Sequence, residues 1–384
     1  MNRFASTVVA ALVATGSAIP VAGAQGSLST LGFGYPVGGM STRVSGTAGA
    51  FGEIDALTPS NPAMLGGIAK TVVSVQAEPE LRTLRFGGIR EKTSAQRIPL
   101  ISVIFPARHG IAAGFSMASV LDRSYTLNTT GSVLLDGETL TTTDRLNVRG
   151  AIGKLSGAVG WQATPRLKIG LAGNLFTGDN LVAREQKFSD TLSFGSVTDT
   201  SHVTYFGKAL TAGADVQIVK GLAATLSYRT SGSLDARVRD TVRASANVPS
   251  ALGASLRYEG IPGSTFVLAL EQVAWSKMRN IGSGLTTAQD ASNVRFGVET
   301  AGPKWRGLPV LFRAGFAKNQ LPFSITTERV TESRWSTGVG LPVAANGWGT
   351  IDLSLQRANR SLPGTTTKES AWLFGIGLQV RPGG

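Results

Sequence analysis

The chain has 384 residues, 42% of them hydrophobic, and contains no cysteine, so disulfide bonds are excluded and a bundle of membrane helices would need a more apolar composition. Lysine and arginine number 37 against 24 aspartate and glutamate residues, which gives a net charge of +13. Because the basic residues are spread singly, without a cluster or an aromatic-rich motif, the charge indicates contact with anionic lipid or saccharide headgroups, or a basic lumen, and not a nucleic-acid partner.

Residues 1–24 have the pattern of an export signal. A basic start that contains Arg3 precedes an apolar and small-residue core over residues 4–19, and Ala22-Gly23-Ala24 is a small-residue cleavage site. We expect cleavage before Gln25; an N-terminal membrane helix is the alternative. No other stretch approaches 18 apolar residues, so the sequence predicts no spanning helix in the mature chain.

Residues 25–68 form a segment without alternation. It is rich in glycine, as in the run 32–39, and it contains prolines and charges such as Glu53 and Asp55. A strand that faces lipid cannot have this composition, because prolines and charges are costly there. Two interpretations remain: a periplasmic extension, or a plug folded inside a barrel.

Residues 69–384 follow a period of two, which is the period of a β-strand. The predicted strands cover residues 70–89, 98–106, 110–130, 139–162, 166–188, 201–219, 221–241, 249–258, 264–276, 291–300, 309–319, 334–342, 349–360 and 369–381. The pattern therefore predicts an all-β fold, a transmembrane antiparallel β-barrel of about 14 strands.

The last strand shows the alternation most clearly. Trp372, Phe374 and Ile376, followed by Leu378 and Val380, face one side, and small or polar residues face the other. This large apolar face is about ten residues long, the length of a tilted strand that crosses a bilayer. We expect the strand to pair with the first one and so to close the barrel; a strand of a soluble sandwich is the alternative.

The connections between the predicted strands alternate in length. Short turns occur at residues 107–109, 163–165, 220, 259–263, 302–308 and 343–348. Longer and more polar loops occur at residues 90–97, 131–138, 189–200, 242–248, 277–290, 321–333 and 361–368. Short periplasmic turns and longer outer loops are typical of a bacterial outer-membrane barrel, and an even strand number places both termini in the periplasm.

Two further patterns fit this topology. Tryptophan prefers membrane interfaces, and we expect Trp161, Trp305 and Trp348 at the periplasmic ends and Trp275, Trp335 and Trp372 at the outer ends. Charged residues on the polar faces should line the lumen, where they form ion pairs with one another. These predicted lumen charges include Arg149, Asp215, Arg229, Arg257, Glu271, Arg295, Glu299, Arg313 and Asp352.

The sequence offers little for catalysis. His109 lies in a predicted periplasmic turn, and His202 opens a predicted strand near Asp199 and Ser201, where an ordinary rim position explains it better than an outer-membrane hydrolase site. There is no cysteine and no paired-histidine spacing for a metal, so we expect no enzyme activity, no metal and no cofactor.

Two stretches resemble the FadL-type outer-membrane transporters, including the related Por-type barrel proteins. The first is Ser41-Thr-Arg43, Gly49-Ala-Phe51, Asp55 and Asn61-Pro-Ala-Met-Leu65, which is similar to the N-terminal signature of that family. The second joins Leu311-Phe-Arg-Ala-Gly-Phe316 and Gln320-Leu-Pro-Phe323 to Ser336-Thr-Gly-Val-Gly-Leu341, which resembles its C-terminal hairpins.

The resemblance implies a 14-stranded barrel with an N-terminal hatch in its lumen. It also implies passage of hydrophobic small molecules, such as long-chain fatty acids, which leave sideways into the membrane. By position, Arg43, Asp55, Asn61 and Pro62 belong to the hatch, where we expect them to shape and anchor it. The ligand-binding residues stay unknown at this stage.

Two functions from different classes are therefore open. The first is transport of hydrophobic molecules across the bacterial outer membrane, with outer-membrane lipid, a hydrophobic small-molecule ligand and the barrel-assembly machinery as partners. The alternative is a barrel that does not transport and serves a secretion system or surface attachment, with a secretion-system partner.

Overall fold

The computed structural model describes residues 28, 33–86, 89–135, 138–189, 195–281, 287–324, 327–343 and 348–382. The predicted export signal lies outside these residues. The chain divides into two compact units, one of residues 1–26, 126–147 and 183–200, and one of residues 27–125, 148–182 and 201–384. In the smaller unit, which holds parts of the long strands β6 to β9, Arg184 and Asp144 form an ion pair at 3.4 Å. The site lies in the larger unit.

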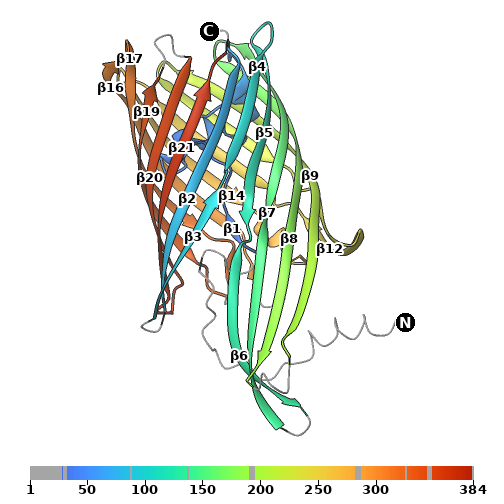
Figure 1. Ribbon diagram of the computed structural model, residues 1–384. Helices are drawn as coiled ribbons and strands as arrows, with labels where there is room; N and C mark the ends of the chain where they lie inside the picture. The colour runs from blue at the N-terminus through green and yellow to red at the C-terminus, as the bar shows by residue number, and fades with distance from the viewer. Residues whose placement is uncertain are drawn as a thin grey trace. The chain divides into compact units, whose positions relative to one another are not determined.

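Fourteen antiparallel strands build the wall of the larger unit (Figure 1). In order around the wall they are β2 (Val72–Phe86), β4 (Leu100–Pro106), β5 (Ile111–Asp122), β7 (Glu138–Thr164), β8 (Leu167–Phe188), β9 (Val197–Val219), β10 (Leu222–Arg229), β13 (Ala251–Tyr258), β14 (Ser264–Val273), β16 (Ala291–Trp305), β17 (Leu308–Gln320), β19 (Thr331–Pro342), β20 (Gly349–Ser361) and β21 (Lys368–Val380). The predicted antiparallel barrel is confirmed.

The first and last strands close the barrel. β21 pairs with β2 in the register Val75 with Leu378 and Leu81 with Trp372, and with β20 on its other side. On β21 the exposed side chains are the apolar ones predicted from the alternation, and the residues between them are buried. A closed sheet has no free edge, and an apolar outer face of this kind places the strands in lipid, as in a bacterial outer membrane.

The remaining elements are short or extend the wall. The strands are β1 (Tyr35–Pro36), β3 (Ile89–Arg97), β6 (Tyr125–Leu135), β11 (Ser233–Val238), β12 (Thr241–Asn247), β15 (Thr287–Ala288) and β18 (Phe323–Ser324). The helical turns are α2 (Thr42–Ser45), η2 (Ala50–Glu53), η3 (Pro62–Leu65) and η4 (Trp275–Met278). Among the described residues no helix is long and apolar enough to cross a membrane.

Three predicted loops are largely strands. The described residues of the predicted loop 131–138 lie in β6 and at the start of β7. Residues 90–97 lie in β3, which pairs with β2, and most of residues 242–248 lie in β12, which pairs with β11. The loop prediction was wrong there because most of these side chains are exposed on both faces, so the alternation that marks a membrane strand disappears while the backbone hydrogen bonds continue.

Trp275 also departs from its prediction. It lies in η4, only 6% exposed, instead of facing lipid at an interface, and its ring contacts Phe323 edge-on at 5.7 Å. Trp335 and Trp372 are exposed on the wall, as expected for residues at a membrane interface. We call the end of the barrel that carries the longer connections the outer end.

Candidate functional site

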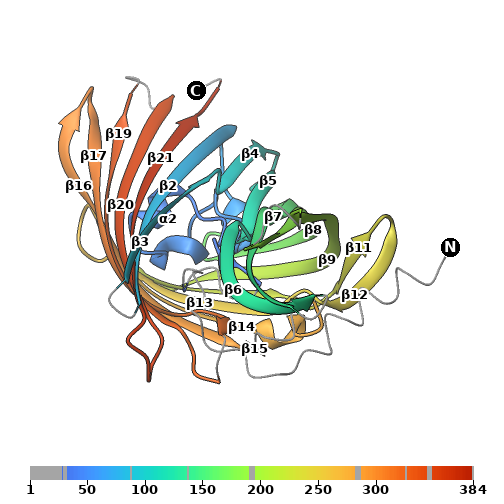
Figure 2. The same ribbon diagram turned by 60° about the horizontal axis from the view of Figure 1, so that its bottom comes forward.

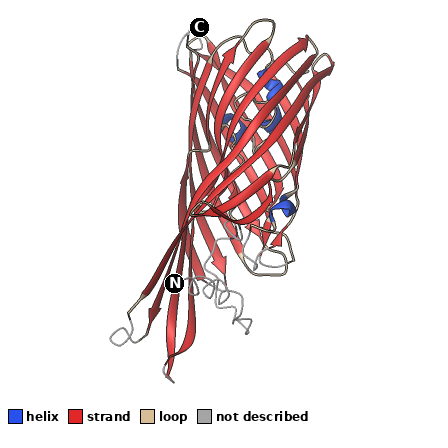
Figure 3. Ribbon diagram, turned by 90° about the vertical axis from the view of Figure 1, so that its right-hand side faces the viewer, coloured by secondary structure: helices blue, strands red, loops and turns tan. Residues whose placement is uncertain are grey.

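The N-terminal segment folds into three helical turns inside the ring of strands (Figures 2 and 3). We call its described residues 33–68 the hatch. Ser41 caps α2, because its hydroxyl accepts a hydrogen bond from the amide of Val44 at 3.2 Å. Asn61 caps η3 in the same way, accepting from the amide of Ala63 at 3.0 Å, and Pro62 fits the first helical position. Local hydrogen bonds therefore fix the helical turns, and the apolar residues Val44, Phe51, Ile54 and Met64 form a buried cluster with Val267 and Ala269 of the wall.

Glycines on the inner face of the wall make room for the hatch. A Cβ atom at Gly315 would lie 2.2 Å from the carbonyl carbon of Thr47, and one at Gly170 would lie 2.4 Å from that of Pro62. The wall glycines with such close contacts to the hatch are Gly160, Gly170, Gly213, Gly253, Gly297, Gly315, Gly338 and Gly377. At Gly160, Gly170, Gly315 and Gly338 backbone of the hatch contacts backbone of the wall, and at the other four a hatch side chain occupies the space that a Cβ atom would need.

Arg43 ties the hatch to the wall by charge. Its Nη2 donates to Glu299 at 2.6 Å, its Nε donates to the same carboxylate at 3.0 Å, and Asp55 lies 3.6 Å away within the hatch. Glu299 also accepts from Arg313 at 2.6 Å, and Arg313 pairs with Asp352. Residues predicted separately as hatch and lumen charges thus form one network.

The other predicted residues are placed as follows. Asn61 extends its amide toward the carbonyl of Ala214 at 3.5 Å, and Pro62 lies against Gly160 and Gly170. Asp215 pairs with Arg257 at 3.6 Å, and Glu271 with Arg295 at 2.6 Å. Each of these side chains faces the interior.

Arg149 does not face the interior. Its side chain is exposed, while its neighbour Val148 and the nearby Ile152 are buried. The prediction assumed that the polar face is always the inner one. Here the inner face is apolar, since Ile152 belongs to a buried hydrophobic cluster, so Arg149 points outward.

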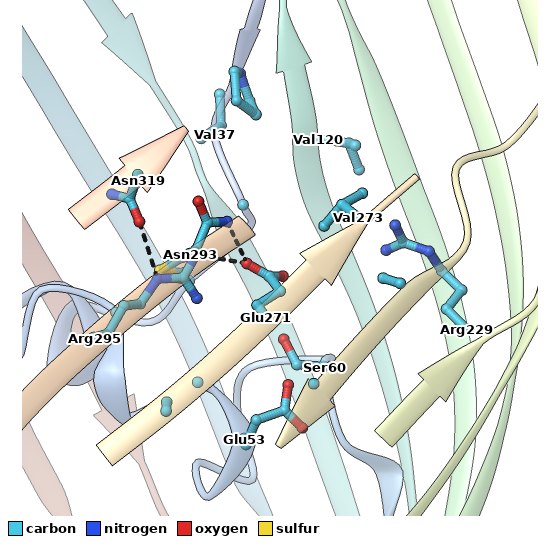
Figure 4. Close-up of a pocket in the computed structure, with 18 of the residues that line it drawn as sticks. Val37, Glu53, Ser60, Val120, Arg229, Glu271, Val273, Asn293, Arg295 and Asn319 are labelled. Carbon is cyan, nitrogen blue, oxygen red and sulfur yellow. Dashed lines mark hydrogen bonds and ion pairs between the residues drawn. The ribbon is translucent and has the colours of Figure 1, made fainter. Parts of the chain in front are cut away.

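A cavity lies between the hatch and the inner face of β7, β9, β10, β13, β14 and β16, with about 1340 Å³ of empty space that is partly continuous with solvent. Figure 4 shows polar and charged residues of its lining: Glu53 and Ser60 of the hatch, and Arg229, Glu271 and Arg295 of the wall. Glu332, Arg334 and Lys154 also line it.

Two cations at this cavity form no direct ion pair among the described residues, although the carboxylates of Glu53 and Glu271 line the same cavity. Lys154 is 7% exposed, and its ammonium donates to the backbone carbonyl of Pro59 at 3.0 Å. Arg229 donates twice to the carbonyl of Pro249, each at 3.2 Å. Within the described part of the chain, neither forms an ion pair with a carboxylate. A charge shielded from water without a directly paired carboxylate is costly, which makes these two groups candidates for contact with an anionic ligand.

Glu53 was not predicted as a site residue, because it lies in a segment without periodicity. It is 8% exposed, and its Oε2 has no hydrogen-bond partner among the described residues. The inward orientation of Lys154 could have been predicted from the sequence, because it lies on the same face of β7 as Ile152 and Ser156.

Above the cavity, toward the outer end, aromatic side chains meet inside the wall. Phe33 of the hatch contacts Tyr205 edge-on at 5.6 Å and lies 6.1 Å from Phe323, which also contacts Trp275. Together with buried Leu121, Ile152, Phe176, Leu234 and Met278 these residues form the outer-mouth cluster.

One place in the wall is filled by the hatch. β4 pairs with β5 over Leu100–Pro106. Beyond β4, toward the outer end, β3 pairs with β2, and among the described residues it does not pair with β5. The outer part of β5 therefore lacks a wall strand on this side. β1 takes its place, with Tyr35 opposite Asp122 and Pro36 opposite Leu121, and Val37 donates to the carbonyl of Val120 at 2.9 Å (Figure 1). Tyr35 to Gly38 also line the cavity, so β1 separates the cavity from the wall position between β3 and β5.

The fold and site define a 14-stranded β-barrel of the outer-membrane type with an N-terminal segment folded in its lumen. No family model matches the sequence, and no curated protein matches it. Solved structures do match in fold. A FadL homologue from Pseudomonas aeruginosa aligns with a TM-score of 0.61 at 10% identity, over 89% of this chain and 98% of that one.

Two channels for aromatic compounds align similarly. The CymD monoaromatic hydrocarbon channel has a TM-score of 0.56 at 13% identity, over 90% of this chain and 98% of its own. The toluene transporter TodX of Pseudomonas putida has a TM-score of 0.56 at 12% identity, over 89% and 98%. The resemblance to FadL-type transporters is therefore confirmed at the level of the fold, and these three structures are of transport proteins, not enzymes.

We expect docking of the hatch to depend on pH through Glu53. Burial raises the pKa of Glu53 from 4.5 to about 7. Hydrogen bonding by Ser227 and the positive charges of Arg295 and Lys154 act in the opposite direction but are weaker. The folded state therefore binds the proton more tightly than the unfolded state, and the docked hatch loses stability as pH rises from about 4.5 to 7.

The measurement is hydrogen exchange of the amides of residues 40–66 in the folded barrel at pH 5 and pH 8, corrected for intrinsic exchange rates. Protection should fall between the two values in the wild type and stay constant in Glu53→Gln, which mimics the protonated acid. Glu328→Gln, at an exposed outer position, is the matched control and should keep the wild-type pH dependence. Equal pH dependence in Glu53→Gln contradicts the assignment.

Proposed function

We propose that this protein passes hydrophobic molecules that carry an anionic head, such as long-chain fatty acids, across the outer membrane. The observation that carries this proposal is a pair of cations at the luminal cavity, the buried Lys154 and the half-buried Arg229, whose hydrogen bonds among the described residues go to backbone carbonyls. A carboxylate would supply the missing counter-charge, and charge-assisted hydrogen bonds of that kind contribute about 1.5–3 kcal/mol.

The proposed path has three parts. The tail of the molecule enters through the outer-mouth cluster, whose aromatic side chains offer apolar contacts at the outer end. The head then reaches Lys154 and Arg229 in the cavity. For exit, β1 leaves β5, and the wall position between β3 and β5 opens sideways toward lipid. β1 suits this step because it pairs over only two residues, Tyr35 and Pro36.

The hatch then acts as the barrier to free diffusion. We also propose that the hatch covers residues 25–68, that the export signal is cleaved before Gln25, and that the barrel contacts the barrel-assembly machinery. Toluene and monoaromatic hydrocarbons, the compounds of the structurally similar TodX and CymD channels, have no carboxylate. In this proposal the charged cavity distinguishes the present chain from those channels.

The test is equilibrium binding of oleate, of oleyl alcohol and of toluene to the full folded barrel in detergent micelles. Oleate should bind the wild type, and the double variant K154Q/R229Q should weaken oleate binding about tenfold or more, since each charged contact is worth about 1.5–3 kcal/mol. Oleyl alcohol shares the tail and lacks the charge, so its affinity should not change. The control variant K220Q/K304Q neutralises two exposed lysines at the short-turn end of the barrel and should behave like the wild type.

Other outcomes would redirect the proposal. Strong toluene binding with no preference for oleate would indicate neutral hydrocarbons as the solute. Absence of binding by all three compounds, together with a protein that co-purifies at one-to-one stoichiometry, would favour the alternative function as a secretion or attachment barrel.

A further inference from the structure

Six neighbouring strands present three rows of outward-facing residues at the outer end. The strands are β17, β19, β20, β21, β2 and β3, and their registers align each row across the wall. The lowest row is Phe316, Trp335, Arg357, Trp372, Leu81 and Ser94. The middle row is Lys318, Ser333, Asn359, Ser370, Thr83 and Lys92, and the highest is Gln320, Thr331, Ser361, Lys368, Arg85 and Arg90.

The lowest row marks a membrane interface. Trp335 is 61% exposed and Trp372 is 43% exposed, and Phe316 packs beside Trp335 with ring centroids 4.5 Å apart. Between the two tryptophans, the guanidinium of Arg357 lies 4.8 Å from the ring centroid of Trp372. Tryptophan concentrates at the level of lipid headgroups, so the two rows above it stand in the headgroup layer.

Those rows are strongly basic. Lys318, Lys92, Lys368, Arg85 and Arg90 are exposed, and no position of the three rows is acidic. Lys368, Arg85 and Arg90 lie directly opposite one another across three strands. Like charges in direct register destabilise a sheet, and within the described residues none of these cations has an ion pair.

We propose that this surface, the basic rows of β17 to β3, binds the phosphates of an acylated and phosphorylated saccharide lipid in the outer leaflet. The phosphates neutralise Lys368, Arg85, Arg90 and Lys92, while the acyl chains lie against the aromatic row and the apolar side chains below it. Arg357 contacts the ring of Trp372 at the boundary between the acyl chains and the headgroups. There its planar guanidinium can donate two parallel hydrogen bonds to one phosphate.

Charge complementarity selects this occupant. A zwitterionic phospholipid brings its own cation to each phosphate, whereas a phosphorylated saccharide brings anionic charge without one. On another part of the wall an exposed acidic residue is present: Asp179 lies 3.7 Å from His202.

The test uses the full folded chain in nanodiscs of zwitterionic lipid, with lipid A as the probe and native mass spectrometry to count bound molecules. The variant R85Q/R90Q/K92Q/K368Q should bind lipid A about tenfold or more weakly, because each basic residue near an anionic surface contributes measurably to attachment. The control variant K70Q/R108Q/K220Q/K304Q removes the same charge from exposed positions at the short-turn end and should bind as the wild type does. A heat-shift gel verifies that both variants are folded.

Dephosphorylated lipid A provides the second arm, since it keeps the saccharide and the acyl chains. It should bind weakly to the wild type and equally weakly to both variants. Wild-type affinity in the first variant, or equal affinity for the phosphorylated and dephosphorylated lipids, overturns the proposal. An equal loss in the two variants also overturns it, because total charge and not this surface would then determine binding.

Discussion

Gly315→Val should displace the hatch and raise ion conductance through the barrel. The added Cβ atom would lie 2.2 Å from the carbonyl carbon of Thr47, and the contact is with backbone, which cannot rotate away as a side chain can. Overpacking of this kind costs about 1–3 kcal/mol, enough to shift a short segment held by local contacts. The wall itself should persist, since apart from the two residues of β1 beside β5 its strand pairing does not involve the hatch.

The matched control is Gly173→Val, where an added Cβ meets nothing within 4 Å. Both variants carry the same substitution on a wall strand, so a difference between them reports the hatch contact alone. Single-channel recording in planar bilayers measures the conductance, and hydrogen exchange of residues 40–66 measures docking. Unchanged conductance and exchange in Gly315→Val would mean that the hatch does not depend on its contact with β17.

The wall was predictable because one physical constraint repeats along it. Each membrane strand must place apolar residues in lipid at every second position, as in Phe374, Ile376 and Leu378, and that period is visible without any tertiary information. The constraint ends where the strands leave the membrane. β12 has exposed residues on both faces, so nothing in its sequence distinguishes it from a loop.

The site was only partly predictable. The residues of the network around Glu299 were identified, some by alternation and some by resemblance, but the pairing of Arg43 with Glu299 spans 256 positions in the chain. It depends on how the hatch fits against wall glycines, which no local pattern encodes. Lys154 and Glu53 were not predicted as site residues, because a single charged residue can be assigned to a site only when the cavity around it is known.

The structural role of Arg360 could not be predicted from the sequence either, because its ion-pair partners lie on three other strands. Arg360→Met should destabilise the barrel by about 3–5 kcal/mol, the usual effect of removing one partner from a buried ionic cluster. The side chain is fully buried on β20 and bonds carboxylates from three other strands: Glu80 of β2 at 3.0 Å, Glu332 of β19 at 2.7 Å, and Glu369 of β21.

This cluster lies at the seam where the first strand, β2, meets the last, β21. Without the guanidinium, the carboxylates from these three strands would repel one another in a region shielded from water, so the seam should open first on unfolding. Arg357→Met is the matched control, because it removes the same group from the same strand on the lipid face, where contact with Trp372 contributes about 0.5–1 kcal/mol. Urea unfolding in lipid vesicles, followed by tryptophan fluorescence, gives both free energies, and equal losses would show that Arg360 does not clamp the seam.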